Sequence, residues 1–405
     1  MSIEIKLPTI NSLGTSSLEP YSVNMQPAFW RPIVRRFPAS TASFSRIVYA
    51  AAHVVPNARL AQDPWLDCKL DWEATINYRR HLWSLGMGVA EAMDTAQRGM
   101  GLDWPTSLEL IARSVAASKD FPNALIASGC GTDHLAPEDA NSLDDVIRAY
   151  EMQMNAIQNL GGKLIIMASR ALAKVAKGPE DYEYVYDRIL SQADKPVILH
   201  WLGDMFDPAL KGYWGSEYTA SAMSTALDVI NANVAKIDGI KISLLAKDRE
   251  ITMRRRLPKN VRMYTGDDFN YPELIAGDTT GAFVNNHRSD ALLGIFDAIA
   301  PAANAALSEL VLGKDDEFQK ILEPTVPLSR CIFQAPTRFY KTGIVFLAWL
   351  NGHQDHFTMV GGQQSTRSIL HFSELFKLTD QAGLFDEPEQ ACRKMKSLLA
   401  VHGIE

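Results

Sequence analysis

The sequence predicts an α/β protein: a (β/α)₈ TIM barrel with an N-terminal extension and additional C-terminal helices. Short apolar runs recur along the chain, and each is followed by a helical pattern. Eight such pairs cover about 250 residues, which is the usual size of this barrel. The runs are apolar without alternation, as in a parallel sheet buried on both faces. The predicted strands are residues 47–52, 88–92, 124–128, 163–167, 196–199, 240–242, 261–265 and 281–285.

The segments between these runs carry apolar residues three and four positions apart, which indicates helices with one buried face. Asp71 is the expected N-cap of the first helix, and Gly161-Gly162 is the expected end of the third. The alternative, a doubly wound open sheet, normally shows a GxGxxG turn after an early strand, and the chain has none. The predicted helices are residues 71–85, 105–118, 142–160, 179–193, 216–233, 246–257, 271–276, 289–311, 315–321, 342–350, 369–382 and 387–402.

Three regions are expected. Residues 1–45 are rich in Pro and Ser and form an N-terminal extension, because prolines interrupt any long element there. Residues 46–300 form the barrel. Residues 301–405 form a helical region packed on it.

Composition excludes several classes of function. The 405-residue chain has a net charge of −7, which argues against a nucleic-acid or anionic-membrane partner. Its four cysteines have neither CxxC nor zinc-finger spacing, and no apolar run reaches the ~18–20 residues that cross a bilayer. The first residues lack the pattern of a signal peptide. We therefore expect a cytoplasmic protein without a membrane partner.

Polar residues follow almost every predicted strand. Catalytic groups of such barrels lie at the carboxyl ends of the strands, so these residues predict an active site at one mouth. Taken singly, each of these residues has another explanation: it could cap a helix or form a hydrogen bond within a loop. The strand-end residues are His53; Glu91, Asp94, Thr95 and Arg98; Asp133 and His134; Ser169 and Arg170; His200 and Asp204; Lys241 and Ser243; Asp267, Asp268 and Asn270; and Asn285, Asn286, His287 and Arg288.

Lys241 is the central candidate. It lies near the end of the run VAKIDGIKISL, residues 234–244, directly after Gly239-Ile240. On an inward-facing strand its ammonium would lose solvation, its pKa would fall, and the amine would become a nucleophile at neutral pH. The alternative is a strand-end lysine whose charged head reaches water.

Several short motifs resemble the dihydrodipicolinate synthase / N-acetylneuraminate lyase family of class I aldolases. They are Gly239-Ile240-Lys241 on the sixth strand, Thr265-Gly266-Asp267-Asp268 after the seventh, the run 196–200, the start of the first helix at 70–73, and the C-terminal segment 336–352. The resemblance runs in order from about residue 46 to 352. It identifies the chain as a divergent branch, of the kind described as a domain of unknown function.

The resemblance implies a mechanism. Lys241 would attack a carbonyl carbon and form a Schiff base, and the protonated imine would act as an electron sink for making or breaking a C–C bond. The enzyme would then be a lyase without a cofactor, acting on a 2-oxo acid or a sugar-like carbonyl compound. Family members are usually dimers or tetramers, which implies a homo-oligomer. Apolar residues of the C-terminal segment (Phe339, Val345, Phe346 and Trp349) are candidates for its contact surface, or else they pack on the barrel.

The chain departs from the family at two places. His200 stands where the family has a proton-relaying tyrosine, and a histidine can transfer protons near neutral pH. Asp94 and Thr95 stand in place of a Gly-Thr-Thr-Gly-Glu turn, and Asp94 would repel a carboxylate. Pyruvate is therefore disfavoured, and Arg170 or Arg288 would bind an anionic group elsewhere on the substrate. The predicted catalytic residues are Lys241 and His200, and the predicted substrate-binding residues are Asp94, Thr95, Arg170, Asp267, Asp268, Asn285, His287 and Arg288.

Two other classes of function remain open at this stage. A metal-dependent isomerase, hydrolase or class II aldolase would bind a divalent metal through strand-end residues, chiefly His53, Glu91, His134 and His200, with Asp94 and His287 as further candidates. No HxH or HExxH motif supports it. The third class is a barrel that binds a small molecule without catalysis.

Overall fold

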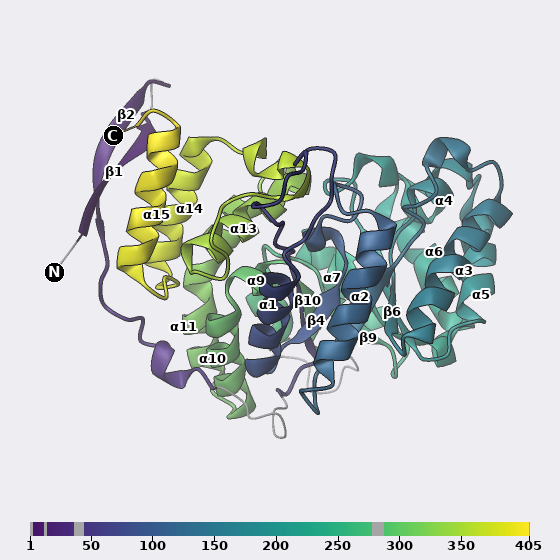
Figure 1. Ribbon diagram of the computed structural model, residues 1–405. Helices are drawn as coiled ribbons and strands as arrows, with labels where there is room; N and C mark the ends of the chain where they lie inside the picture. The colour runs from purple at the N-terminus through teal and green to yellow at the C-terminus, as the bar shows by residue number, and fades with distance from the viewer. Residues whose placement is uncertain (1–2, 12–13, 36–43, 278–286, 405) are drawn as a thin grey trace.

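The centre of the protein is a closed barrel of eight parallel strands (Figure 1). The computed structural model describes residues 3–11, 14–35, 44–277 and 287–404. Strands that follow one another in sequence are neighbours in the barrel, and the last strand pairs with the first. This confirms the predicted (β/α)₈ TIM barrel. The barrel strands are β3 (Val48–Ala51), β4 (Gly88–Glu91), β5 (Ile126–Cys130), β6 (Lys163–Ile166), β7 (Val197–Leu202), β8 (Ile237–Ser243), β9 (Arg262–Thr265) and β10 (Asp290–Leu293).

Helices between the strands form the outer layer. Asp71 accepts a hydrogen bond from the Ala74 backbone N–H at 3.0 Å and caps the first helix, as predicted. Ser142 and Asp145 form a capping box at the start of the third. The helices of this layer are α1 (Trp72–Ser84), α2 (Trp104–Ser118), α3 (Leu143–Asn159), α4 (Arg170–Val175), α5 (Pro179–Leu190), α6 (Thr219–Ala232), α7 (Lys247–Arg256), α8 (Tyr271–Ala276), α9 (Ile295–Ala298) and α10 (Ala300–Val311).

The eighth strand differs from the prediction. The barrel closes with β10, which pairs with β9 and β3. The predicted strand 281–285 lies outside the described residues, and the predicted helix 289–311 is in fact β10 followed by α9 and α10. The run Asp290–Leu293 is only four residues long, and periodicity does not separate so short a strand from the start of a helix.

Two glycines make room for the tyrosines that fill the barrel interior. A Cβ on Gly239 would lie 2.7 Å from Cε2 of Tyr264, and one on Gly88 would lie 2.7 Å from Cδ1 of Tyr49. The two rings meet edge to face at 6.1 Å between centroids. The glycine before Ile240-Lys241 is therefore required by packing inside the barrel.

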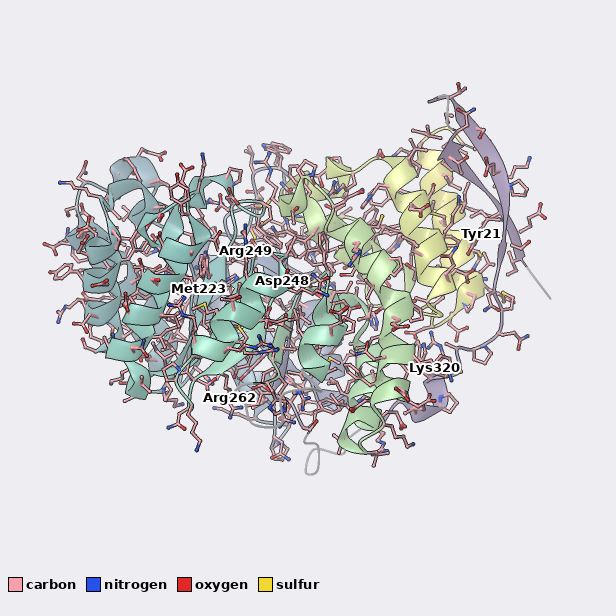
Figure 2. All side chains as sticks on the ribbon, turned by 180° about the vertical axis from the view of Figure 1, so that it is seen from behind. Tyr21, Met223, Asp248, Arg249, Arg262 and Lys320 are labelled. Atoms are coloured by element: carbon pink, nitrogen blue, oxygen red, sulfur yellow. The ribbon has the colours of Figure 1, made fainter. Side chains whose placement is uncertain are left out.

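Charged residues gather at the amino end of the barrel. Asp238 accepts a hydrogen bond from the Tyr264 hydroxyl at 2.6 Å and lies 3.2 Å from the Lys163 amine. Arg262, labelled in Figure 2, pairs with Asp290 at 3.0 Å. The opposite, carboxyl end is thus the mouth that holds the strand-end residues.

The N-terminal residues pack on the C-terminal helices (Figure 1). Strands β1 (Ile3–Ile10) and β2 (Ser16–Val23) form an antiparallel hairpin, and the Tyr21 hydroxyl donates to Asp380 at 2.8 Å (Figure 2). The predicted boundary at residues 300/301 falls at the first residue of α10, and the three-region division stays a prediction. The C-terminal helices are α11 (Asp315–Leu322), α12 (Val326–Ile332), α13 (Tyr340–Leu350), α14 (Ile369–Gln381) and α15 (Pro388–Val401).

The apolar residues of α13 are buried within the chain. Val345, Phe346 and Trp349 are at most 7% exposed, so they pack internally and offer no contact surface for another copy. Among the described residues, no helix combines the length and the apolar character that crossing a bilayer requires.

Candidate active site

Lys241 lies on the sixth barrel strand with its side chain directed inward. Its neighbours Ile240 and Ile242 pack in the core between strands and helices, so the alternation of β8 aims Lys241 at the barrel interior. The residue is 7% exposed. Within the described part of the chain its amine has no hydrogen bond or ion pair. Burial lowers the pKa of Lys241, and the charges of Asp268 and Asp94 oppose that effect.

Asp268 is the buried carboxyl that interacts with this amine. Its Oδ1 accepts a hydrogen bond from the Ile295 backbone N–H at 2.9 Å. Burial raises the pKa of Asp268 to about 7, although the charge of Lys241 counteracts this. Asp267 has a different role, because its carboxylate accepts from the backbone N–H groups of Phe269 and Asn270 and so caps a turn.

His200 stands beside Lys241 on the neighbouring strand. The two residues are partners in the β7–β8 register, and His200 Nε2 lies 3.3 Å from Ser243 Oγ. Burial lowers the pKa of His200 well below its usual value, and the charge of Lys241 lowers it further. The imidazole is therefore neutral at neutral pH and able to accept a proton.

The turn after β4 contacts the start of α13. Lys341 Nζ lies 3.4 Å from Asp94 Oδ1, and the Tyr340 hydroxyl lies 2.7 Å from Thr95 Oγ1. Tyr340 and Lys341 are both buried, and the charges of Asp94 and Asp268 both act on Tyr340. These two residues were not predicted for the site. The only signal for them is their place inside the 336–352 segment that resembles the aldolase family.

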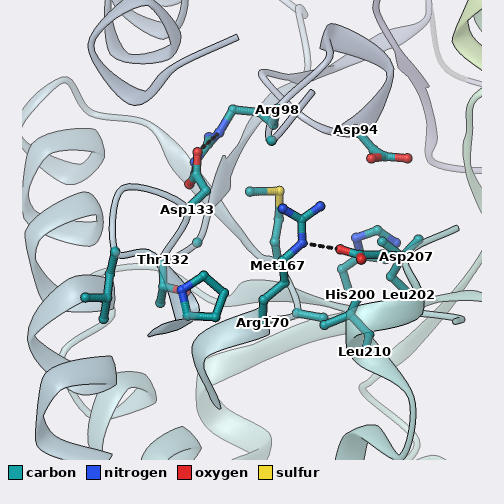
Figure 3. A pocket seen from close by; sticks show the side chains of 15 residues that line it. Asp94, Arg98, Thr132, Asp133, Met167, Arg170, His200, Leu202, Asp207 and Leu210 are labelled. Carbon is teal, nitrogen blue, oxygen red and sulfur yellow. Dashed lines mark hydrogen bonds and ion pairs between the residues drawn. The ribbon is translucent and has the colours of Figure 1, made fainter. Parts of the chain in front are cut away.

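A cavity of about 100 Å³ opens next to these residues (Figure 3). Arg170 enters it from the start of α4, and its Nε donates to Asp207 at 2.5 Å. On another wall Arg98 forms a two-point ion pair with Asp133. The cavity is lined by Asp94, Arg98, Gly99, Gly131, Thr132, Asp133, Leu135, Pro137, Met167, Ala168, Arg170, His200, Leu202, Asp207 and Leu210.

Two of the predicted substrate-binding residues are not part of this mouth. His287 and Arg288 precede β10, at the amino end of the barrel, whereas Lys241 lies toward the carboxyl end of β8. Their prediction was wrong because it placed the eighth strand before them. Asn285 lies outside the described residues. Asp94, Thr95, Arg170 and Asp268 do meet at the mouth, and Arg170 is the predicted anion-binding arginine that stays there.

The predicted metal ligands do not converge. His53 Nδ1 binds Asp297 at 2.9 Å, Glu91 pairs with Arg79 at 2.8 Å, and the His134 Nδ1 lies 2.9 Å from Gln153. Among the described residues, no group of three or more His, Cys, Asp and Glu side chains has the geometry of a metal site. The side chains predicted to bind a metal in the metal-dependent alternative therefore do not form a common site.

A second cavity of about 670 Å³ lies beside α1 and the loop that follows α13. It is larger than the first, and its lining includes His81, His353 and His356. Neither Lys241 nor His200 borders it. The smaller cavity is the candidate active site because His200, the register partner of Lys241, lines it together with Asp94.

The closed parallel barrel carries an inward lysine on its sixth strand, and comparisons with solved structures agree on the fold. The chain is similar to the 4-hydroxy-tetrahydrodipicolinate synthase of Methylacidiphilum fumariolicum SolV, with a TM-score of 0.61 and 13% identity over 87% of this chain and 99% of that one. It is also similar to a putative dihydrodipicolinate synthetase from Pseudomonas aeruginosa, with a TM-score of 0.60 and 15% identity over 85% and 99%. A third similar structure is YagE, a prophage protein of the dihydrodipicolinic acid synthase family from E. coli K12 in complex with pyruvate (TM-score 0.60, 13% identity, 90% and 100% covered).

The chain belongs to the family described as "Protein of unknown function (DUF993)", whose model matches residues 18–404. No curated protein matches it. The predicted resemblance to the dihydrodipicolinate synthase family is thus confirmed in the fold, and the low identity fits a divergent branch of it.

Proposed function

We propose that this protein is an aldolase-type lyase in which Lys241 forms a Schiff base with a carbonyl substrate and a C–C bond is made or broken. One observation carries the proposal. Among the described residues the Lys241 amine is buried without a hydrogen bond or ion pair, and its register partner His200 lines a cavity at the carboxyl end of the barrel. Burying an ammonium group without a partner costs free energy. A protein retains such a lysine where its amine must stay free to react with a substrate.

The first step joins enzyme and substrate. The neutral amine of Lys241 adds to the carbonyl carbon, the carbonyl oxygen leaves as water, and a C=N bond remains. Protonation of that nitrogen makes the iminium ion. Asp268, whose pKa lies at about 7, is the proposed group that exchanges this proton.

The second step breaks the C–C bond. A base removes the proton of a hydroxyl two carbons from the imine carbon, and the electron pair of the broken bond moves to the imine nitrogen. One fragment leaves as a carbonyl compound, and the other stays on Lys241 as an enamine. Neutral His200 is the proposed base, and it returns the proton to the enamine carbon before water releases the second product. The reverse sequence makes the bond.

We further propose that the enzyme works in the cytoplasm as a homo-oligomer, a dimer or tetramer. The loop after β3 supports this proposal, because it exposes Trp65 and Leu66 at 72% and 78%. Large apolar side chains with such exposure are typical of surfaces that another chain covers.

The proposal is tested by incubating the protein with a panel of carbonyl compounds and sodium borohydride. Reduction of an imine gives a stable secondary amine and irreversible loss of activity. We expect inactivation only when a carbonyl compound and borohydride are present together. The absence of inactivation and of adduct with every carbonyl compound would refute the Schiff-base mechanism.

A further inference from the structure

Most hydrogen-bond donors of the cationic side chains around the candidate active site are already used. Arg98 has five N–H groups. They donate to Asp133, Gln153 and the carbonyls of Ala92 and Gly129. Its charge helps to build the wall, but it has no N–H left for a substrate.

Lys341 is saturated in the same way. An ammonium has three donors. Those of Lys341 reach Asp94 Oδ1 at 3.4 Å, the sulfur of Met100 at 3.1 Å and the carbonyl of Arg338 at 3.1 Å. The side chain contacts Asp94 and leaves no donor for an anion in the cavity.

Arg170 differs from both. Only its Nε has a hydrogen bond, to Asp207, within the described part of the chain, so Nη1 and Nη2 keep four free N–H groups. These two nitrogens lie 3.3 and 3.4 Å from the place of a Cβ on Gly99, in the turn after β4. Arg170 stands at the end of β6, and Lys241 on β8, with β7 between them. An anionic group bound by Arg170 would therefore be separate from the carbonyl group.

Acceptors, by contrast, surround the amine. The carboxylates of Asp94 and Asp268 both interact with Lys241. The Thr95 hydroxyl beside them is occupied by Tyr340. A carboxylate attached to the carbonyl carbon would meet these negative groups, whereas a hydroxyl there would donate to Asp94.

From these contacts we infer that the substrate is a hydroxylated carbonyl compound with an anionic tail, of the sugar-acid or sugar-phosphate class. Its carbonyl lies at Lys241, the neighbouring hydroxyl donates to Asp94, and the carboxylate or phosphate tail binds Nη1 and Nη2 of Arg170. The inference rests on the proposed Schiff-base function.

The inference is tested with small probes that differ by one group, trapped by borohydride and measured as the rate of adduct formation. 5-Hydroxy-4-oxopentanoate has both the hydroxyl and a carboxylate tail. 4-Oxopentanoate lacks the hydroxyl, hydroxyacetone lacks the tail, and pyruvate places the carboxylate on the carbonyl carbon. Dihydroxyacetone phosphate replaces the carboxylate tail by phosphate. One charged hydrogen bond is worth enough to change binding about tenfold or more.

We expect 5-hydroxy-4-oxopentanoate or dihydroxyacetone phosphate to give the fastest adduct formation. Its rate should exceed the rates with 4-oxopentanoate, hydroxyacetone and pyruvate by about tenfold or more. Arg170→Gln should remove the advantage of the tail, so that in this variant 5-hydroxy-4-oxopentanoate is trapped no faster than hydroxyacetone. Asp94→Asn keeps an acceptor oxygen but removes the charge, and it should raise the rate with pyruvate. A thermal melt of each variant shows whether it is folded.

The results separate the inference from the function on which it rests. Faster trapping of pyruvate than of the hydroxylated probes, or an Arg170→Gln variant that keeps the advantage of the tail, would overturn the inference and leave the Schiff base intact. A lack of adduct with all five probes would overturn both.

Discussion

Lys241 of β8 and His200 of β7 are partners in the barrel register, and both side chains are buried. The amine and the neutral imidazole therefore share one small volume, in which the charge of Lys241 disfavours a proton on His200. A proton held by one of them makes a proton on the other less stable. This arrangement suits a pair in which the amine acts as nucleophile and the imidazole as base.

The first prediction concerns the imidazole. His200→Gln should leave imine formation at Lys241 within a few fold, because the amine remains, but should lower kcat by about 10²–10⁴-fold through loss of the proton transfer. Borohydride trapping and steady-state kinetics on the same preparation measure the two effects. Equal losses of trapping and turnover would contradict a separate role for His200.

The second prediction concerns the buried ion pair behind β4. Arg79→Met leaves Glu91 charged and unpaired in the core, and it should lower the free energy of unfolding by about 3–5 kcal/mol. Arg80→Met is the matched control, because Arg80 lies next in the sequence and pairs with Asp120 at the surface. That change should cost less than about 1 kcal/mol. Urea unfolding compares them, and similar losses would mean that the Glu91 pair is not structural.

A third prediction tests the packing below Lys241. Gly239→Ala places a Cβ 2.7 Å from the Tyr264 ring and from the Arg262 carbonyl oxygen. We expect a loss of about 1–3 kcal/mol in unfolding free energy from this overpacking. In the double variant with Tyr264→Leu the ring clash is absent, so the cost of the alanine should shrink. An unchanged cost would place the strain at the backbone contact alone.

The fourth prediction is a pH dependence of stability. Burial raises the pKa of Glu250 to about 8, and Thr265 and Ser289 donate to its carboxyl group. Because the folded-state pKa lies above the unfolded value of about 4.3, the folded form holds a proton that the unfolded chain releases. This contribution to stability is complete below that unfolded value and is lost as pH rises to about 8.

Glu250→Gln keeps the size and a hydrogen-bonding oxygen but does not titrate. Its free energy of unfolding should fall less than that of the wild type between pH 5 and pH 8, a range set by the same two pKa values. Urea titrations at several pH values give both curves. Parallel curves would show that Glu250 is not protonated in the folded state.

Seven of the barrel strands follow from the sequence because each is an apolar run bounded by glycine, proline or polar residues. β10 does not, since Asp290–Leu293 is short and leads through Gly294 directly into α9. Because the eighth strand was predicted too early in the sequence, His287 and Arg288 were assigned to the wrong end of the barrel. Lys241 was found because seven strands were enough to number it as the sixth.

The sequence does not distinguish the two faces of a strand end. Ala90 points into the barrel and Glu91, one residue later, points to α1 and α2, where it binds Arg79 and Ser114. A shift of one residue exchanges these faces. Contacts between distant segments are also invisible, and the Thr95–Tyr340 hydrogen bond spans 245 positions. The sequence did identify Asp94 and His200 as site residues, because they stand at positions where the resembled family has other residues.

The most direct measurement is to locate the reduced adduct. The protein is treated with borohydride and the best carbonyl probe, digested, and sequenced by mass spectrometry. We predict an adduct of about one per chain on Lys241, none on Lys241→Met, and an unchanged adduct on Lys236→Met, whose lysine bonds the Ala193 carbonyl outside the site. An adduct on another lysine, or an undiminished adduct on Lys241→Met, would contradict the assignment of Lys241 as the nucleophile.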